Sequence, residues 1–241
     1  MAKSNWSDWQ RYPGRWDTVN GRRLFPADNL YGIPSMPPVS ENHLPRWLVP
    51  YKTRIRSQRS LEDGALHFFL DDYRFETVWF QPGNTLKSLQ RYTTLLSPDF
   101  SVYVDWPRAI QVWNVYRNRW CGAYWQDLGF TVIPTVSWGG PDSHDFCFAG
   151  LPQHSLLAIS TVGTHVFGTD KAPNVAAHFW SGFLEMVERL QPTRVLCYGK
   201  PHSGMSELVP LVHYPDRWTN IRAARKTSPL VYQLGGEQDG W

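Results

Sequence analysis

Short apolar runs alternate with longer amphipathic stretches from about residue 65 onward, and this alternation is the strongest constraint on the fold. Short apolar and β-branched runs are typical of buried strands, whereas apolar residues spaced three or four apart indicate helices. Strands that alternate with helices favour a mainly parallel sheet joined by crossover helices. We therefore expect an α/β fold whose sheet has about five or six strands and is either open or partly closed and barrel-like.

The same periods predict the individual elements. Strands are expected over residues 65–70, 77–80, 100–104, 130–136, 155–162 and 194–199. Helices are expected from Asn84 or Thr85 to near Pro98, and over residues 107–128, 173–190 and 204–212. Pro107 suits the first turn of its helix and Gly129 suits the position just after the helix ends. Pro134, inside its run, indicates an edge position, a bulge or a strand that ends early.

Three regions follow from the distribution of residue types. Residues 1–60 are rich in Pro, Gly and Asn and show no sustained period, which predicts an irregular extension packed on the body through its aromatic residues. Residues 61–213 form the predicted α/β domain, and residues 214–241 an irregular tail. The extension is basic, with ten Lys and Arg against four Asp and Glu, although the whole chain carries a net charge of only +3.

Several functional classes find no support in the residue patterns. The three cysteines are far apart and show neither a disulfide framework nor CxxC spacing. The polar N-terminus and the absence of a long apolar run predict a cytoplasmic protein without a membrane span. Phosphate-loop, dinucleotide-binding, hydrolase-elbow and zinc-ligand spacings are also missing, so neither a cofactor nor a bound zinc is predicted.

Polar residues at the ends of predicted strands give a candidate catalytic site. Loops after the carboxyl ends of parallel strands line the ligand site of α/β folds. Paired carboxylates near cations suit acid/base chemistry or a metal-bound phosphate. The candidate catalytic residues are Asp71, Asp72, Arg74, Asp105 and Lys200. The candidate ligand-binding residues are Arg117, Trp138, Ser160 and Thr161.

Four aspartates (Asp71, Asp72, Asp99 and Asp105) and one arginine have structural alternatives. An Asp after a strand is also an ordinary turn former or helix cap, and Asp105, just before Trp106 and Pro107, fits a cap well. Arg117 shares the apolar stripe of its helix, so it is either a buried partner of an aspartate or a ligand anchor. Asp99 precedes the predicted strand 100–104, which places it at the opposite edge of the sheet in a turn or cap.

The basic extension is a candidate nucleic-acid-binding segment. Its arginines are interleaved with Trp and Tyr residues, and cations with flat rings are what single-stranded DNA or RNA binding requires. The alternative is that the rings pack on the body while the arginines stay in solvent. The candidate arginines are Arg22, Arg23, Arg54, Arg56 and Arg59.

The chain resembles an uncharacterised family, the domain of unknown function 4417. The resemblance rests on HFFLDDYRFETVWF, SPDFSVYVDWP, NVYRNRWCGAYWQDLGFTVIPTVSWG, FAGLPQHSLLAISTVG and RVLCYG, and covers roughly residues 30–200. It implies an origin in bacteria or their mobile elements, including phages, and implies no activity. The family's recurring motifs correspond to Asp71, Asp72, Arg74, Asp99, Ser101, Arg117, Trp120, Trp125, Gln126, Pro134, Trp138, Ser160 and Gly163.

Three hypotheses of function follow. The leading hypothesis is a nucleic-acid-associated protein of a bacterial or phage mobile element, with single-stranded DNA or RNA as a possible partner, and the other two are alternatives to it. The second is an enzyme, cofactor-independent or dependent on a divalent metal, with an Asp, Arg and Lys pocket at the carboxyl ends of the strands. The third is a protein-protein interaction module that uses exposed aromatic residues. The sequence leaves the choice among them, and the oligomeric state, open.

Overall fold

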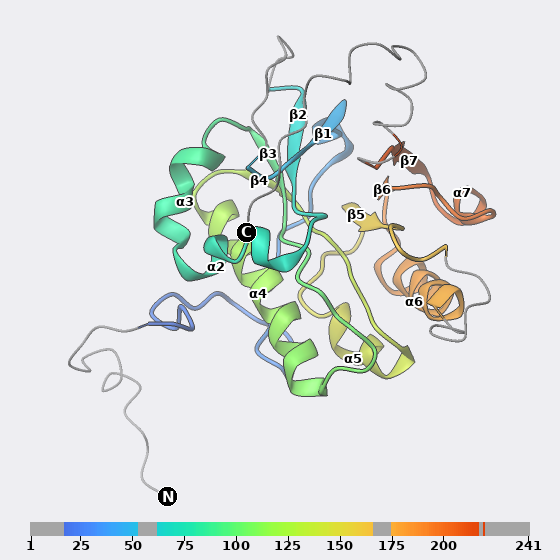
Figure 1. The fold of residues 1–241 in the computed structure, drawn as a ribbon, viewed down its shortest axis with the longest axis horizontal. Helices are drawn as coiled ribbons and strands as arrows, with labels where there is room; N and C mark the ends of the chain where they lie inside the picture. Colours follow the sequence, from blue (N-terminus) through green and yellow to red (C-terminus); the bar gives the residue numbers. More distant parts are fainter. Residues whose placement is uncertain (1–16, 53–61, 166–174, 217–218, 220–241) are drawn as a thin grey trace, which may run out of the picture.

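Parallel strands surrounded by helices form the centre of the molecule (Figure 1). The computed structural model describes residues 17–52, 62–165, 175–216 and 219 of the 241-residue chain. Arg54, Arg56 and Arg59 lie outside these described residues. None of the described helices is both long enough and apolar enough to cross a lipid bilayer.

The described residues contain seven strands arranged in two parallel sheets. The first sheet has the order β1-β2-β3-β4 and the second the order β5-β6-β7. A parallel bridge between Thr135 and Ala158 joins the end of β4 to β5. The strands therefore follow one another in chain order, in an arrangement that curves without closing into a barrel. Their bounds are β1 (Trp47–Pro50), β2 (Gly64–His67), β3 (Thr94–Leu96), β4 (Thr131–Ile133), β5 (Leu156–Ser160), β6 (Arg194–Tyr198) and β7 (Leu211–Tyr214).

Helices connect the successive strands from β2 to β7 and pack against the sheets (Figure 1). The α-helices are α2 (Thr77–Phe80), α3 (Pro82–Leu89), α4 (Arg108–Asp127), α5 (His144–Cys147), α6 (Val175–Leu190) and α7 (Met205–Leu208). The 3-10 helices are η1 (Glu41–His43), η2 (Asp72–Arg74) and η3 (Pro141–Ser143). This strand and helix order confirms the predicted α/β class and the mainly parallel sheet.

One face of every strand contributes to a single buried cluster, which we call the inner face. Side chains along a strand alternate between its two faces, so a shared cluster from all seven strands requires the sheets to curve around it. The strand residues of the inner face are Leu48, Ala65, Leu96, Ile133, Leu156, Ala158, Leu196, Tyr198, Val212 and Tyr214. His67 also lies within the sheet, 1 % exposed and close to the Tyr198 ring, and burial lowers its pKa to about 3.

The opposite faces of the strands pack on helices through aromatic side chains. Behind β1–β4, the Trp79 ring of α2 meets Trp120 of α4 edge to face at 5.4 Å, and Trp125 stacks on Phe68 at 5.4 Å. Behind β5–β7, α6 contributes a smaller cluster that includes Phe183. Much of the high tryptophan content therefore serves the core, where large rings bury much apolar area.

Several predicted elements are confirmed, with shorter strands than expected. Helix α4 begins one residue after Pro107, and Gly129 follows its end with a positive φ of 90°. Strand β4 stops at Ile133, so Pro134 marks a strand that ends early, although β4 does not lie at the edge of the combined arrangement. Strands β5 and β6 lie within the predicted ranges 155–162 and 194–199.

The prediction of a strand over residues 77–80 is wrong, because these residues form helix α2. Four apolar residues in a row do not distinguish a strand from a short helix. The helical form turns both Val78 and Trp79 into the core against α4. Helix α3 is also shorter than predicted, ending at Leu89 instead of near Pro98.

The predicted strand over residues 100–104 is also wrong. This segment has no strand pairing. The actual strand is β3, which begins six residues earlier, in what the sequence suggested was the end of a helix. Polar side chains replace the sheet ladder along the segment, since Asp72 accepts the Ser101 N–H bond at 3.1 Å and Asn114 donates to the Ser101 carbonyl at 2.6 Å.

Two edge strands were not predicted, because the residues around them resemble other structures: a Pro-rich irregular region for one strand and a helix for the other. Strand β1 lies in the Pro-rich region before residue 60, and pairs with β2 from Trp47 opposite Gly64 onward. Strand β7 lies where a helix over residues 204–212 was expected, and the helix present there, α7, covers only Met205–Leu208. Each edge strand pairs with the strand next to it in the chain, β1 with β2 and β7 with β6.

A buried arginine ties α4 to the end of β4 and to α5. Arg119 is 1 % exposed, and its guanidinium donates to the carbonyls of Thr135, Cys147 and Ala149 and to the Asn118 side chain. Burial lowers its pKa to about 10, while nearby Asp99 acts in the opposite direction. The guanidinium therefore stays charged at neutral pH, solvated by backbone oxygens instead of water.

We predict that Arg119→Met destabilises the protein by about 3 kcal/mol or more, because buried carbonyls lose their donors. Arg119→Lys should recover only part of this loss, since one ammonium cannot reach the same set of acceptors. The measurement is the urea midpoint at neutral pH. Arg91→Met is the control at an exposed position, and equal midpoints for the Arg119 and Arg91 variants would contradict the assigned role.

Candidate functional site

A pocket of about 490 Å³ opens at the carboxyl ends of β3, β4 and β5. Three loops and one helix line it: the segment after β3, the segment after β4, the residues after β5, and the first turns of α6. Ligand sites in parallel α/β folds lie at this end of the strands. The pocket is therefore the candidate functional site among the described residues.

Ser137 and Ser160 continue the inner face into the floor of the pocket. The bridge between Thr135 and Ala158 aligns the segment after β4 with β5, and each serine lies two residues after its bridge residue. Side chains two residues apart point to the same side of a strand. The two hydroxyls are therefore at the same level on neighbouring strands.

Asp99 contributes a carboxyl group to the same pocket. It follows β3 by three residues, and a hydrogen bond from Ser137 holds it at the carboxyl edge of the sheet. Burial is the main cause that raises its pKa to about 7, and the negative charge of Asp72 raises it further. The Ser137 hydrogen bond and the positive charge of Arg119 act in the opposite direction.

A carboxyl group with this pKa exchanges a proton close to neutral pH. An acid or base is most effective when its pKa lies near the working pH, and perturbed carboxyl groups in clefts are frequent at catalytic sites. His178 of α6 also lines the pocket, and its carbonyl accepts the Trp138 Nε1–H bond at 3.2 Å. The site therefore combines one proton-exchanging acid with an imidazole and several hydroxyl groups, among them those of Ser137 and Ser160.

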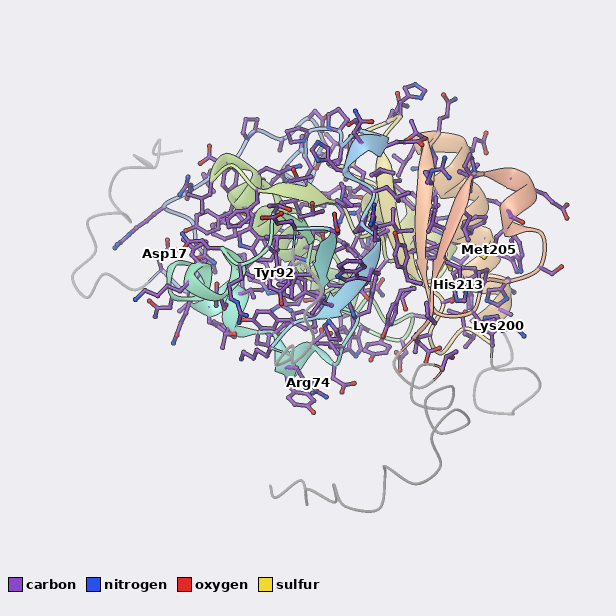
Figure 2. All side chains as sticks on the ribbon, turned by 90° about the horizontal axis from the view of Figure 1, so that it is seen from above. Asp17, Arg74, Tyr92, Lys200, Met205 and His213 are labelled. Atoms are coloured by element: carbon purple, nitrogen blue, oxygen red, sulfur yellow. The ribbon has the colours of Figure 1, made fainter. Side chains whose placement is uncertain are left out.

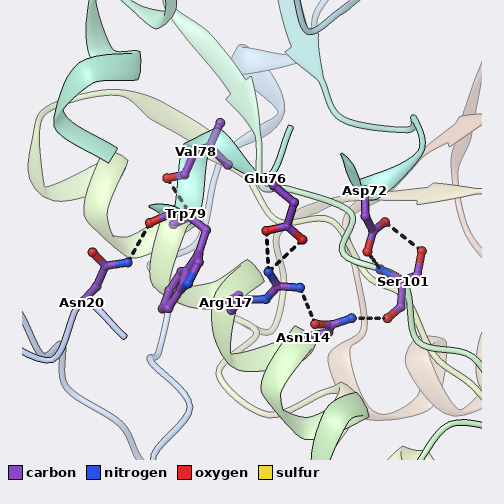
Figure 3. A network of polar contacts seen from close by, with 9 residues as sticks. Asn20, Asp72, Glu76, Val78, Trp79, Ser101, Asn114 and Arg117 are labelled. Carbon is purple, nitrogen blue, oxygen red and sulfur yellow. Dashed lines mark hydrogen bonds and ion pairs between the residues drawn. The ribbon is translucent and has the colours of Figure 1, made fainter. Parts of the chain in front are cut away.

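Asp72 positions the segment that carries Asp99. Its carboxylate accepts hydrogen bonds from the Ser101 backbone N–H at 3.1 Å and from the Ser101 hydroxyl at 2.8 Å (Figure 3). Asp72 does not line the pocket, but its charge reaches Asp99. The sequence analysis predicted Asp72 as a catalytic residue, and the geometry gives it an indirect influence through Asp99.

Arg117 is committed to a buried ion pair with Glu76. One guanidinium nitrogen lies 3.0 Å and 2.8 Å from the two carboxylate oxygens, and the other donates to Asn114 (Figure 3). The guanidinium also lies 3.9 Å from the centre of the Phe100 ring. Of the two predicted roles, the structure places Arg117 in an ion pair, but with a glutamate of the α2 region instead of an aspartate, and away from the pocket.

The structure does not bring the other predicted catalytic residues to the pocket. Asp71 and Arg74 are exposed around η2, and Asp105 lies in an exposed turn and does not cap α4. Lys200 is exposed after β6, far from Arg74 on the surface (Figure 2). The convergence expected of these four residues is absent. Asp105 was placed at a strand end only because β3 was not recognised, whereas Asp71, Arg74 and Lys200 follow strands β2 and β6 but are exposed.

The predicted ligand-binding residues divide evenly. Trp138 and Ser160 line the pocket. Thr161 is buried beneath it and donates to the Tyr198 carbonyl, while Arg117 pairs with Glu76 and holds α2.

The two described arginines of the nucleic-acid prediction have different surroundings. Arg22 is exposed. Arg23 forms an ion pair with Asp127, lies 4.7 Å from the Tyr124 ring centre, and accepts the Trp120 Nε1–H bond through its carbonyl. Arg23 therefore anchors the N-terminal region on α4.

Asp99, Tyr103 and His178 were missed as site residues. Asp99 was assigned to the wrong edge because the strand before it was not recognised. The signal was present as the β-branched and apolar triplet Thr94–Leu96 followed by Pro98, which ends regular structure ahead of a loop. No cluster of three His, Cys, Asp or Glu residues suited to a metal ion occurs in the described part of the chain.

Comparison with known proteins gives the family. The family model "Domain of unknown function (DUF4417)" matches residues 25–215. The chain belongs to this family. It is 42 % identical over 217 residues to the "Gene 1 protein" of Mycobacterium phage D29, covering 89 % of this chain and 77 % of the relative. It is 41 % identical over 217 residues to the "Gene 1 protein" of Mycobacterium phage L5, covering 89 % of this chain and 91 % of the relative.

The family match confirms the resemblance seen in the sequence and agrees with a phage context. No solved structure matches the chain. Its function is therefore argued from the pocket itself.

We predict a carboxyl resonance that titrates near pH 7 in the wild-type protein and in Asp71→Asn, but not in Asp99→Asn, measured by carbon-detected NMR. Asp72→Asn should lower this midpoint, because a neighbouring negative charge disappears. If no carboxyl group titrates above about pH 5, the electrostatic account of the site is wrong.

The same shift has a consequence for stability. The folded-state pKa of Asp99 lies above its ordinary value of 3.8, so its ionisation costs stability as pH rises from 3.8 to about 7. The free energy of unfolding of Asp99→Asn, relative to that of the wild type, should therefore increase as pH rises across this window, by at most about 1.4 kcal/mol per pH unit. Unfolding in urea at several pH values measures the difference.

Proposed function

We propose that this protein is an enzyme whose active site is the pocket at the ends of β3, β4 and β5, with Asp99 as its general acid and base. The observation that carries the proposal is a carboxyl group set among hydroxyls, an imidazole and aromatic rings in a concave site at the functional end of a parallel sheet. Such a combination is the usual starting hypothesis for an active site.

Residues around Asp99 have distinct tasks in this proposal. Ser137 holds the carboxyl group, and the buried charge of Arg119 behind it limits how far its pKa rises. The substrate contacts Asp99, Ser160 and Trp138 in the pocket. Asp72 acts as a positioning residue, because it holds the 99–104 segment through Ser101 and sets the proton affinity of Asp99.

The proposal predicts turnover that depends on Asp99. Purified protein is incubated with a small-molecule extract of bacterial cells, and consumption is followed by mass spectrometry. We expect at least one compound to be consumed by the wild type and by Asp71→Asn, but about a hundredfold more slowly by Asp99→Asn, the usual scale of a lost general acid or base. The rate should change with a midpoint near pH 7. Equal consumption by all three proteins would sink the proposal.

We propose association with single-stranded nucleic acid as a second candidate function. It is supported by the charge of residues 1–60, where ten Lys and Arg face four Asp and Glu, and by the phage proteins among the relatives. Arg23 is the weakest member of the predicted set, since Asp127 already pairs with it. Arg22, Arg54, Arg56 and Arg59 then provide the phosphate contacts.

The second candidate predicts a salt-dependent affinity that these arginines carry. Arg54 and Arg56 are changed to Gln in the full chain, and binding to a single-stranded DNA is measured over a range of salt. The salt slope should fall by about 0.7 for each arginine that no longer neutralises a phosphate. Lys87→Gln with Arg91→Gln removes the same charge from the exposed surface beyond residue 60. Equal losses from both pairs would show non-specific attraction and argue against the basic segment.

A further inference from the structure

The pocket has an unusual charge pattern for a site in an α/β fold. Asp99 and His178 line it, and no Lys or Arg is present among its described lining residues. Sites for phosphate or carboxylate use cations or helix N-termini to balance the negative charge. The first turns of α6 also line the pocket, but the Asp99 carboxyl group, when ionised, opposes an anionic ligand, so we expect the pocket to select against phosphorylated compounds.

Aromatic rings form the walls. Trp138 lines one side, and Gly182 of α6 allows its close approach, because a Cβ atom at Gly182 would come within 2.2 Å of the indole. Phe179 packs on Trp138 with ring centres 5.5 Å apart. Tyr103 is 54 % exposed at the mouth and meets Trp106 edge to face at 4.8 Å. Aromatic rings that are fixed by their neighbours favour a planar ligand that stacks on them.

Three hydrogen-bonding groups line the pocket from successive strand ends: Asp99, Ser137 and Ser160. Ser137 donates a hydrogen bond to Asp99, so these two groups lie side by side. The Ser160 oxygen already accepts the Val162 N–H bond at 3.2 Å, which leaves its O–H bond to donate. Adjacent donors and acceptors of this kind suit the polar edge of a planar heterocycle, which also carries donors and acceptors next to one another.

We propose that the ligand of this pocket is an uncharged, nitrogen-containing aromatic heterocycle of the nucleobase or nucleoside class, without a phosphate group. The heterocycle stacks between Trp138 and Tyr103 and presents its polar edge to Asp99, Ser137 and Ser160. This inference rests on the proposed active site and adds the class of its substrate. The pocket volume of about 490 Å³ falls in the range typical of sites for small organic molecules.

Binding of four nucleosides, their 5′-monophosphates, ribose and choline to the wild-type protein tests the inference, measured by saturation-transfer NMR and calorimetry. At least one nucleoside should bind with saturation, and its monophosphate should bind about fivefold more weakly or not at all, since its charge opposes Asp99. Tighter binding of the monophosphate would overturn the inference, as would binding of ribose or choline alone or no nucleoside binding at millimolar concentration.

Variants at the pocket mouth show where the nucleoside binds. Tyr103→Ala should weaken nucleoside binding about tenfold, because the stacking surface disappears. Tyr73→Ala is the matched control, because Tyr73 is 77 % exposed on η2 and lies outside the pocket. Both tyrosines are exposed, so neither change threatens the core. Equal affinities of the two variants would place the nucleoside elsewhere and overturn the inference.

The inference and the proposed function fail in different ways. Asp99-dependent consumption of a non-aromatic compound would leave the enzyme proposal intact and overturn the substrate class. Nucleoside binding that depends on Tyr103, without any Asp99-dependent turnover, would support the ligand class and remove the catalytic proposal.

Discussion

The buried guanidinium of Arg119 is the interaction on which the arrangement around the pocket depends. It joins α4 to the carbonyl of Thr135 at the end of β4 and to two carbonyls of the α5 region. Removing a charge from water is costly, and here several backbone oxygens replace the lost hydration. The bond to Thr135 also satisfies a backbone carbonyl just beyond the end of β4, at the start of the loop that carries Ser137 and Trp138. One side chain thereby stabilises the fold and sets the position of a pocket wall.

A second polar network holds the other wall. Glu76, Arg117, Asn114, Ser101 and Asp72 are connected in sequence from α2 through α4 to the segment that follows Asp99 (Figure 3). The segment makes no sheet ladder, so side chains satisfy its backbone groups. Two buried arginines two residues apart on α4 thus serve opposite sides of the site: Arg117 supports the Asp99 segment and Arg119 the Ser137 loop. The proton affinity of Asp99 reflects both, since Asp72 raises it and Arg119 lowers it.

Local patterns were informative where one period dominated a long stretch, and misleading where several short signals overlapped. Helix α4 carries a regular stripe with a Pro at its start and a Gly after its end, and its bounds were predicted almost to the residue. The segments around α2 and β3 are only four and three residues long, and an apolar run of that length has no measurable period. Missing β3 moved Asp99 to the wrong edge of the predicted sheet and placed Asp105 at the end of a strand that is not present.

The sequence by itself determined the α/β class, the parallel sheet, the long helix and the general end of the sheet at which to look for a site, because these depend on local periodicity and on the chirality of strand connections. It also indicated Trp138 and Ser160, whose strands were recognised. Only the tertiary structure decided that Asp99 meets Ser137 and Ser160, that Arg117 pairs with Glu76, and that Lys200 stays at the surface. Contacts of this kind join residues far apart in the chain, and they depend on the curvature and register of strands that no local pattern contains.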